Sequence, residues 1–176
     1  VKKSIEYFEK AVQSDPDYAL AWIGLADGYN ILAGYGWYIP KKEGYDKAII
    51  YVQKALKLDK TLAEAHTTFG LILGYQQWKW EEAEKKLKLA LKLNPNYAFA
   101  HQIYAQLLDI TGDYEKARKQ IDLALELDPL APVIHRISAT LFYNAENFDE
   151  SLKEYNEVLS VEKNYESAHW GTFLNY

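Results

Sequence analysis

The sequence predicts an all-α protein built as a solenoid of stacked antiparallel helix pairs, and three observations support this prediction. First, a short phrase of Asp, Asn or Glu followed by Pro or Lys recurs at positions 15, 59, 94, 128 and 162, in steps of 44, 35, 34 and 34 residues. Second, apolar residues recur at three- and four-residue intervals, which is the spacing of one helix face. Third, no segment alternates apolar and polar residues for long enough to form a strand.

Each period contains two predicted helices. The residue after each Asp or Asn is often Pro, which cannot continue a helix because it lacks an amide proton. Gly112 marks a turn inside one repeat, since Gly readily adopts positive φ. Helices are therefore predicted at 1–14, 19–33, 45–58, 62–76, 80–93, 96–111, 114–127, 131–145, 148–161 and 165–176.

One repeat domain spans residues 1–176 in this interpretation. It is divided into a partial repeat at 1–16, a long repeat at 17–60 with an insertion at 33–44, three repeats at 61–95, 96–129 and 130–163, and an unfinished repeat at 164–176. Because the chain has no Met and both ends fall inside repeats, we expect the natural protein to continue at both ends. An uncovered terminal helix also predicts self-association.

The composition excludes several functional classes. A hydrophobic content of 49% is ordinary for a globular protein. The net charge of −5 gives the chain no general attraction to nucleic acid or to an anionic membrane. The lack of Cys removes disulfides, Cys-ligated metal and a thiol nucleophile. The uncharged stretches are shorter than the roughly 20 residues that span a bilayer.

The 34-residue period with two helices resembles the tetratricopeptide repeat (TPR) family. Residues 96–129 carry most of its pattern: Tyr104 and Ala105, then Gly112, Ala117 and Asp128. The resemblance implies a right-handed superhelix that acts as a protein–protein interaction scaffold without a cofactor. The long repeat at 17–60 and the segment Trp78-Lys79-Trp80 look like the TPR tails of bacterial winged-helix transcriptional regulators and cyclase-type signalling proteins. That likeness implies a regulatory, cytoplasmic module.

Four histidines raise the question of a metal site. His66, His101, His135 and His169 are separated by 35, 34 and 34 residues, and Trp22 holds the same place one repeat earlier. Successive members lie on the order of 10 Å apart when helices stack. Zinc needs its nitrogen ligands at about 2.0–2.1 Å, so these side chains cannot meet on one ion. We interpret this column as a half-buried packing position, and we expect neither metal nor cofactor.

The family resemblance places the binding surface on the first helix of each repeat. Positions 2, 5, 9, 12 and 13 of that helix line a concave groove in the family. The candidate groove residues in this sequence are Ile23, Asp27, Asn30, Thr67, Leu71, Tyr75, Phe99, Gln102, Gln106, Asp109, Arg136, Thr140, Tyr143 and Trp170.

This mixed surface predicts an apolar or amphipathic protein segment as the partner. Family members that bind the C-terminal carboxylate of chaperones use several Lys, Arg and Asn side chains, whereas here the groove has Arg136 alone. RNA binding is an alternative, because related helical repeats read RNA bases, but the acidic balance argues against it. An enzyme is the remaining alternative, and the sequence has no nucleophile-elbow motif to support it.

The insertion at 33–44 is the second candidate surface. Tyr35, Trp37, Tyr38 and Ile39 are too apolar for an idle loop. They either fold back onto the neighbouring helices, which is the interpretation we favour, or they contact a partner directly.

Overall fold

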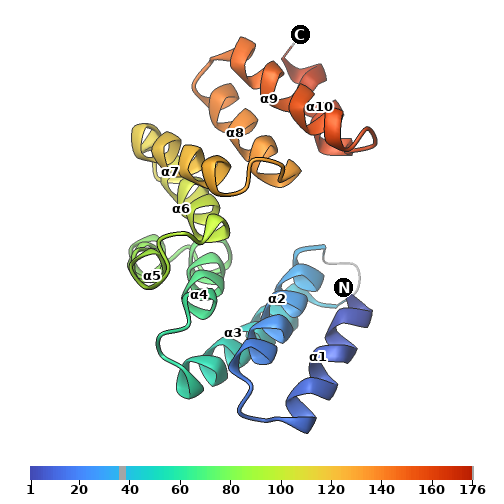
Figure 1. The fold of residues 1–176 in the computed structure, drawn as a ribbon, viewed down its shortest axis with the longest axis vertical. Helices are drawn as coiled ribbons and strands as arrows, with labels where there is room; N and C mark the ends of the chain where they lie inside the picture. The colour runs from blue at the N-terminus through green and yellow to red at the C-terminus, as the bar shows by residue number, and fades with distance from the viewer. Residues whose placement is uncertain (36–38, 176) are drawn as a thin grey trace. The chain divides into compact units, whose positions relative to one another are not determined.

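The computed structural model describes residues 1–35 and 39–175, except for the side chain of Tyr35. These residues form α-helices joined by short turns, which confirms the predicted all-α fold (Figure 1). The helices are α1 (Lys2–Ser14), α2 (Ala19–Tyr35), α3 (Lys41–Leu58), α4 (Ala63–Gln76), α5 (Trp80–Leu93), α6 (Ala98–Ile110), α7 (Tyr114–Leu127), α8 (Pro132–Asn144), α9 (Phe148–Val161) and α10 (Glu166–Leu174).

The helices fall into two compact units, Val1–Pro95 and Asn96–Tyr176. In the first unit, α2 pairs with α3 and α4 with α5, while α1 packs against α2 and α4 contacts both α2 and α3. In the second unit, α6 pairs with α7 and α8 with α9, while α10 packs against α9 and α8. Neighbours within each pair run antiparallel, as Figure 1 shows for α8 and α9.

The recurring acidic or amide residue ends the second helix of each pair. At each of these positions the backbone leaves the helix for a more extended conformation, and its N–H donates to the carbonyl four residues earlier. In the first two cases the carboxylate also holds the following turn. The Asp15 carboxylate accepts from the N–H of Asp17 at 3.1 Å, and that of Asp59 accepts from Thr61 at 2.7 Å. A short acid is favoured here because it bonds its own neighbouring backbone.

The turns inside three repeats share one unusual backbone position. Gly112, Trp78 and Glu146 occupy equivalent places and have φ values of +85°, +57° and +59°. After Gly112 and Glu146, the next N–H donates to the carbonyl five residues earlier, whereas Lys79 donates to Leu73, six residues earlier. The extra residue of the repeat at 61–95 is therefore taken up at the end of α4.

Small residues line the contact within each pair. In α3, α5, α7 and α9 the same position carries Ala48, Ala83, Ala117 or Ser151, all buried. A Cβ placed on Gly70 of α4 would lie 2.8 Å from Cγ of Leu87 in α5. The two backbones approach closely because these side chains are small.

The described residues of the insertion, 33–35 and 39–44, are mostly helical, so the two flanking helices are longer than predicted. Helix α2 continues to Tyr35, and α3 begins at Lys41 rather than near residue 45. A Cβ on Gly44 would lie 2.6 Å from that of Ala33, so the absence of a side chain lets the two extended helices approach. The i,i+4 pairs Lys42–Asp46 and Glu43–Lys47 suit the first turns of α3.

Aromatic residues fill the space between α2 and α3. The ring centroids of Trp22 and Tyr51 lie 5.7 Å apart, and those of Tyr29 and Tyr51 lie 5.6 Å apart. Lys47 lies over the Tyr29 ring at 4.9 Å and Lys54 over the Trp22 ring at 5.8 Å. Part of the high Tyr and Trp content therefore serves packing in the first unit.

Candidate functional site

The Trp and His column has one shared structural role. In four of its members a ring nitrogen bonds the carbonyl six residues earlier, in the turn that precedes its helix. The pairs are Trp22–Pro16 at 2.8 Å, His66–Lys60 at 2.9 Å, His135–Pro129 at 3.0 Å and His169–Lys163 at 2.8 Å. Indole and imidazole can replace each other here because both present a ring N–H to the same carbonyl. Across residues 1–35 and 39–175 no three His, Asp or Glu side chains are grouped so that they could hold a metal ion.

His135 has a second bond that joins α8 to α9. Its Nδ1 lies 2.6 Å from a carboxylate oxygen of Glu154, while Nε2 faces the Pro129 carbonyl. Both partners are acceptors, so the imidazole donates from both nitrogens only as the cation. Burial lowers the pKa of His135, but the Pro129 carbonyl and the Glu154 carboxylate outweigh burial and raise it above 6.5.

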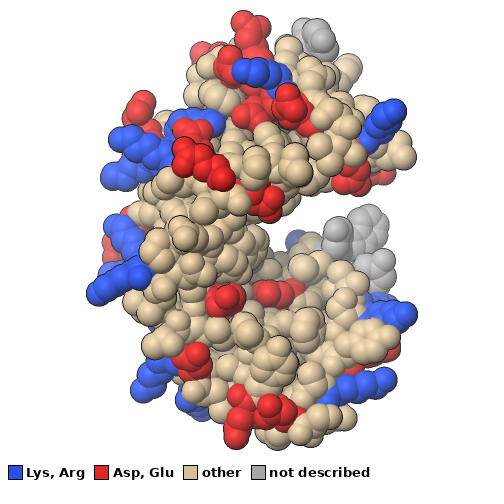
Figure 2. All heavy atoms as spheres, viewed as in Figure 1, with Lys and Arg blue, Asp and Glu red and all other residues tan. Residues whose placement is uncertain are grey.

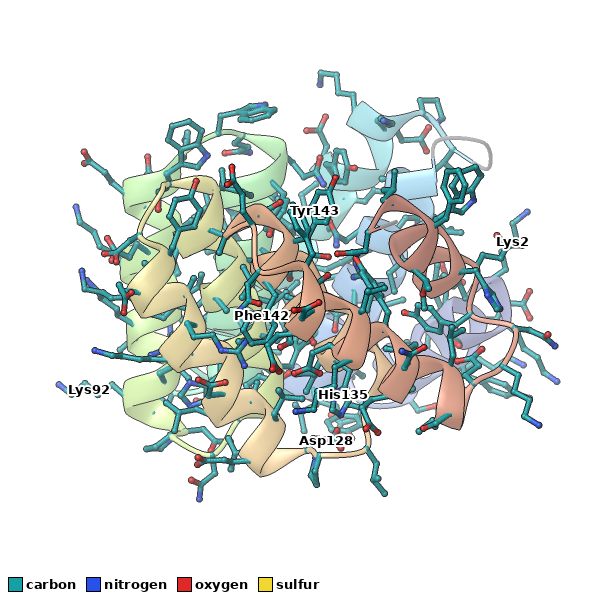
Figure 3. All side chains as sticks on the ribbon, turned by 90° about the horizontal axis from the view of Figure 1, so that it is seen from above. Lys2, Lys92, Asp128, His135, Phe142 and Tyr143 are labelled. Atoms are coloured by element: carbon teal, nitrogen blue, oxygen red, sulfur yellow. The ribbon has the colours of Figure 1, made fainter. Side chains whose placement is uncertain are left out.

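This pair belongs to a larger polar network in the second unit. The Ser138 hydroxyl donates to Glu154 at 3.0 Å and accepts from Arg118 at the same distance. The Arg118 guanidinium also pairs with Asp122 and lies 4.1 Å from the centroid of the Phe142 ring. Figure 3 shows His135 near the start of α8 and Phe142 near its end. The network joins α7, α8 and α9, so we assign it to packing.

Two predicted groove residues of the first unit lie in the core. Ile23 is 4% exposed and packs with Ala26 and Val52. Thr67 is fully buried, and its hydroxyl donates to the Ala63 carbonyl at 2.9 Å. The positions of Ile23 and Thr67 within their helices did not predict that they are buried, because burial depends on how α2, α3 and α4 pack together. The other candidates in this unit are partly exposed: Asp27, Asn30, Leu71 and Tyr75.

Asp27 bridges α2 and α4 through a neutral donor. Its Oδ1 accepts a hydrogen bond of 2.8 Å from the Thr68 hydroxyl. Burial raises the pKa of Asp27 and the Thr68 bond only partly opposes that rise. Three residues later on the same helix, the side-chain oxygen of Asn30 is buried and accepts no hydrogen bond from the described residues. Thr68 was not among the predicted residues, since its position alone does not show that it spans two helices.

The second unit brings its predicted residues to the surface of α6, α8 and α10, with one exception. Gln102 is 5% exposed and belongs to the interior. The partly exposed candidates are Phe99, Gln106, Asp109, Arg136, Thr140 and Tyr143. Trp170 on α10 is 66% exposed, and its ring lies 6.0 Å from that of Phe173.

Asp109 repeats the arrangement of Asp27 in the second unit. Its Oδ2 accepts a bond of 2.9 Å from the Asn144 amide of α8, while its Oδ1 is buried without a donor. Burial raises the pKa of Asp109 and the Asn144 bond partly opposes the rise. Tyr143 lies beside Asn144 on α8, and its ring contacts Phe148 at 5.5 Å. Each unit thus has one partly buried carboxylate tied to the next first helix by an uncharged group.

The residues of the insertion are only partly described. Ile39 is half-buried and packs against the cluster of Ile5, Leu25 and Leu32 from α1 and α2. The predicted residues Trp37 and Tyr38, and the side chain of Tyr35, lie outside the described residues.

Charge differs between the two kinds of helix. The first helices of the repeats are α2, α4, α6, α8 and α10. Together they carry four acidic residues and, of all the Lys and Arg residues, Arg136 alone. Every other Lys and Arg lies on a second helix or a connection. The acids are Asp27, Glu64, Asp109 and Glu166. In Figure 2 the Lys and Arg side chains lie at the edges of each unit, while Asp and Glu also occur among the uncharged residues between.

Comparison with known proteins identifies the repeat. Residues 86–119 and 1–18 match two models of the tetratricopeptide repeat family. No curated protein matches the sequence.

Three solved structures illustrate the fold. TTC0263, a thermophilic TPR protein of Thermus thermophilus, is 20% identical with a TM-score of 0.78, over 97% of this chain and 88% of its own. YrrB, described as a TPR protein with an unusual peptide-binding site, is 20% identical with a TM-score of 0.64, over 98% and 83%. A human IFIT1 dimer with m7Gppp-AAAA is 16% identical with a TM-score of 0.84, over 99% of this chain and 42% of its own.

No helix in the described part of the chain has both the length and the apolar character needed to cross a membrane. The chain therefore carries sequence matches to the tetratricopeptide repeat at residues 1–18 and 86–119, and its helix pairs have the fold of tetratricopeptide-repeat proteins.

Proposed function

We propose that this chain is a protein–protein interaction module that binds a peptide or helical segment on the first-helix surfaces of its repeats. One observation carries the proposal: these helices carry partly exposed aromatic and aliphatic side chains together with the partly exposed carboxylates of Asp27 and Asp109. Leu71 and Tyr75 supply the apolar part in the first unit, and Phe99 and Tyr143 in the second. An amphipathic segment buries its apolar residues on such a surface. The peptide-binding site described for YrrB supports this use of the fold.

RNA binding is the second candidate, since the IFIT1 structure contains a capped RNA. Phosphate contacts need several Lys or Arg side chains on the binding surface. The first helices offer Arg136 alone, so charge favours the peptide. A salt-sensitive mobility shift of labelled single-stranded RNA, lost in Arg136→Ala, would reverse this preference.

The biological setting is also part of the proposal. The resemblance of the long repeat at 17–60 to TPR tails of bacterial signalling proteins favours a regulatory, cytoplasmic module without catalysis of its own. The sequence of the full-length gene product tests this directly. A flanking winged-helix or cyclase domain would support the regulatory role, and a flanking catalytic domain of another class would contradict it.

Self-association through α10 remains a prediction. Trp170 and Phe173 are 66% and 69% exposed on this terminal helix, with Leu174 beside them. Light scattering at high protein concentration tests the prediction, and a monomer would contradict it.

A random-peptide display library, selected on the intact chain, tests the proposed binding surface. We expect the selected peptides to lose binding when Tyr75→Ala and Tyr143→Ala are combined. The matched control combines Tyr7→Ala and Tyr114→Ala, because these two tyrosines are exposed on the second helices α1 and α7. If every selected peptide binds both double variants as it binds the wild type, the first-helix surfaces are not the binding site.

A further inference from the structure

We propose that a segment bound on the first-helix surface of either unit is basic as well as amphipathic, with a Lys or Arg placed on Asp27 in the first unit or on Asp109 in the second. This inference rests on the proposed function and adds the chemistry of the partner. It follows from the charge distribution along the helices, from the surroundings of the two carboxylates and from the apolar residues beside them.

The charge distribution comes first. Helices α2, α4 and α6 contain no Lys or Arg, whereas each contains one Asp or Glu. Arg136 of α8 is the only Lys or Arg on the first helices, and the imidazolium of His135 on the same helix is paired with Glu154. A partner that approaches α2, α4 or α6 therefore meets carboxylates and no Lys or Arg, and complementary charge selects a basic partner. An acidic segment would place like charges together, which costs affinity.

The surroundings of Asp27 make it a specific contact point. Among the described residues no Lys, Arg or His pairs with Asp27, and its carboxylate accepts from the uncharged Thr68 hydroxyl. A guanidinium or an ammonium carries several N–H donors. One such group from a partner can neutralise Asp27.

The second unit offers the same chemistry on different residues. The Asn144 amide satisfies one oxygen of Asp109 and leaves the other buried without a donor. Among the described residues no cationic side chain pairs with Asp109. Each unit therefore has its own carboxylate with which no cationic side chain of the described residues pairs, and each can receive one basic residue of a bound segment.

The apolar contacts restrict the partner further. Leu71 and Tyr75 lie on α4, which bonds Asp27 through Thr68. Tyr143 lies next to Asn144, the partner of Asp109. Each carboxylate therefore has an aromatic residue on the neighbouring first helix. Alternating basic and apolar residues, rather than a uniformly charged tail, match this arrangement.

The test uses the peptides selected from the random-peptide display library on the intact wild-type chain. We expect the peptides that lose binding in the Tyr75→Ala, Tyr143→Ala variant to carry net positive charge, and their affinity to fall as NaCl is raised. Asp27→Asn and Asp109→Asn keep the side-chain size, and each should weaken the peptides that bind its own unit by about threefold to tenfold in fluorescence anisotropy. Asp46→Asn and Asp149→Asn are matched controls on exposed residues of α3 and α9, and we expect them to leave affinity unchanged.

Each outcome decides one of the two proposals. Acidic or uncharged peptides that depend on Tyr75 and Tyr143 would overturn the basic-partner inference and leave the proposed function standing. Basic peptides whose affinity is unaffected by Asp27→Asn and by Asp109→Asn would also overturn it. Peptides that bind independently of Tyr75 and Tyr143 would overturn the proposed function itself. Circular dichroism of each variant shows whether the helices are retained.

Discussion

At the scale of single residues, a ring nitrogen of Trp22, His66 and His135 bonds the carbonyl six residues earlier and so ties each first helix to the turn before it. The sequence indicated that Trp22, His66 and His135 hold equivalent places, and predicted a packing role for them. It did not show that each ring bonds the carbonyl six residues earlier, because that carbonyl is brought near only once the turn has formed. The second bond of His135, to Glu154 of the next helix, needed the structure for the same reason.

His135 makes the stability of the second unit depend on pH. Because its folded-state pKa is raised above 6.5, folding favours the imidazolium. This stabilisation is fully present below about pH 6.5 and is lost as the pH rises through the folded-state value. We therefore expect His135→Gln to lower the free energy of unfolding by a larger amount at pH 5.5 than at pH 8.5. Urea titrations at both pH values measure this difference.

His169→Gln is the matched control, because His169 bonds the Lys163 carbonyl and no carboxylate of the described chain pairs with it. If His135→Gln lowers the free energy of unfolding by the same amount at both pH values, the His135–Glu154 pair is not the cause of the pH dependence.

The positive φ of Glu146 predicts a stabilising substitution. A residue with a Cβ loses roughly 1–2 kcal/mol in the left-handed region, and Gly does not. The greater loss of conformational entropy costs Gly about 0.5–1 kcal/mol of folding free energy relative to other residues. The difference predicts that Glu146→Gly stabilises the folded protein by about 0.5–1 kcal/mol. Gly112→Ala should destabilise by a similar amount. Thermal unfolding compares the two variants, and a lower melting temperature for Glu146→Gly would contradict the argument.

At the scale of helices, neighbouring repeats are matched in side-chain volume. Phe8 of α1 fills the space left by Gly24 of α2, and Tyr155 of α9 does the same at Gly171 of α10. At the three equivalent positions between them both residues are buried and of middle size: Val52 and Thr68, Leu87 and Ile103, and Ile121 and Ile137. A large ring on the second helix thus occurs with glycine on the next first helix, whereas a middle-sized residue occurs with another middle-sized residue. The sequence alone did not predict this matching of side-chain sizes, because the contact joins two helices of different repeats.

This match predicts that Gly24→Ala destabilises the first unit. Helix propensity alone would favour Ala by about 1 kcal/mol. The new Cβ would instead overlap the Phe8 ring, and overpacking costs roughly 1–3 kcal/mol. We expect a net loss of stability in urea unfolding, largely recovered in the double variant Gly24→Ala, Phe8→Leu. A Gly24→Ala protein more stable than the wild type would contradict the proposed contact.

Helix ends that depend on a residue next to the helix were predicted correctly. Helix ends that depend on contact with another helix were not. The ends of α3 and α7 at Asp59 and Asp128 follow from the short acid after the helix. The early start of α3 at Lys41 was missed, because the contact between Gly44 and Ala33 depends on two helices meeting. The burial of Ile23 and Thr67 was missed for a related reason. A helical stripe fixes which residues share a face, but not how much of that face neighbouring helices cover.

At the scale of the whole molecule, each unit uses its two kinds of helix differently. Second helices carry most of the Lys and Arg residues, while first helices carry Arg136 alone together with four acidic residues, Asp27 and Asp109 among them. Periodicity and composition were enough to predict the repeat fold, whereas the binding face was assigned from the family resemblance and stays a prediction. They were not enough to identify Thr68 and Asn144 as the groups that hold the two carboxylates in place.

The central claim is that a partner segment binds the first-helix surfaces, and hydrogen exchange measured by mass spectrometry tests it most directly. Exchange is compared for the intact chain alone and with a saturating selected peptide. The account predicts slower exchange in the first helices of the unit that binds the peptide, α2 and α4 or α6 and α8, and no change in the rate of exchange in α3, α5 and α9. Slower exchange confined to the second helices, or to the connection around Pro40, would contradict it.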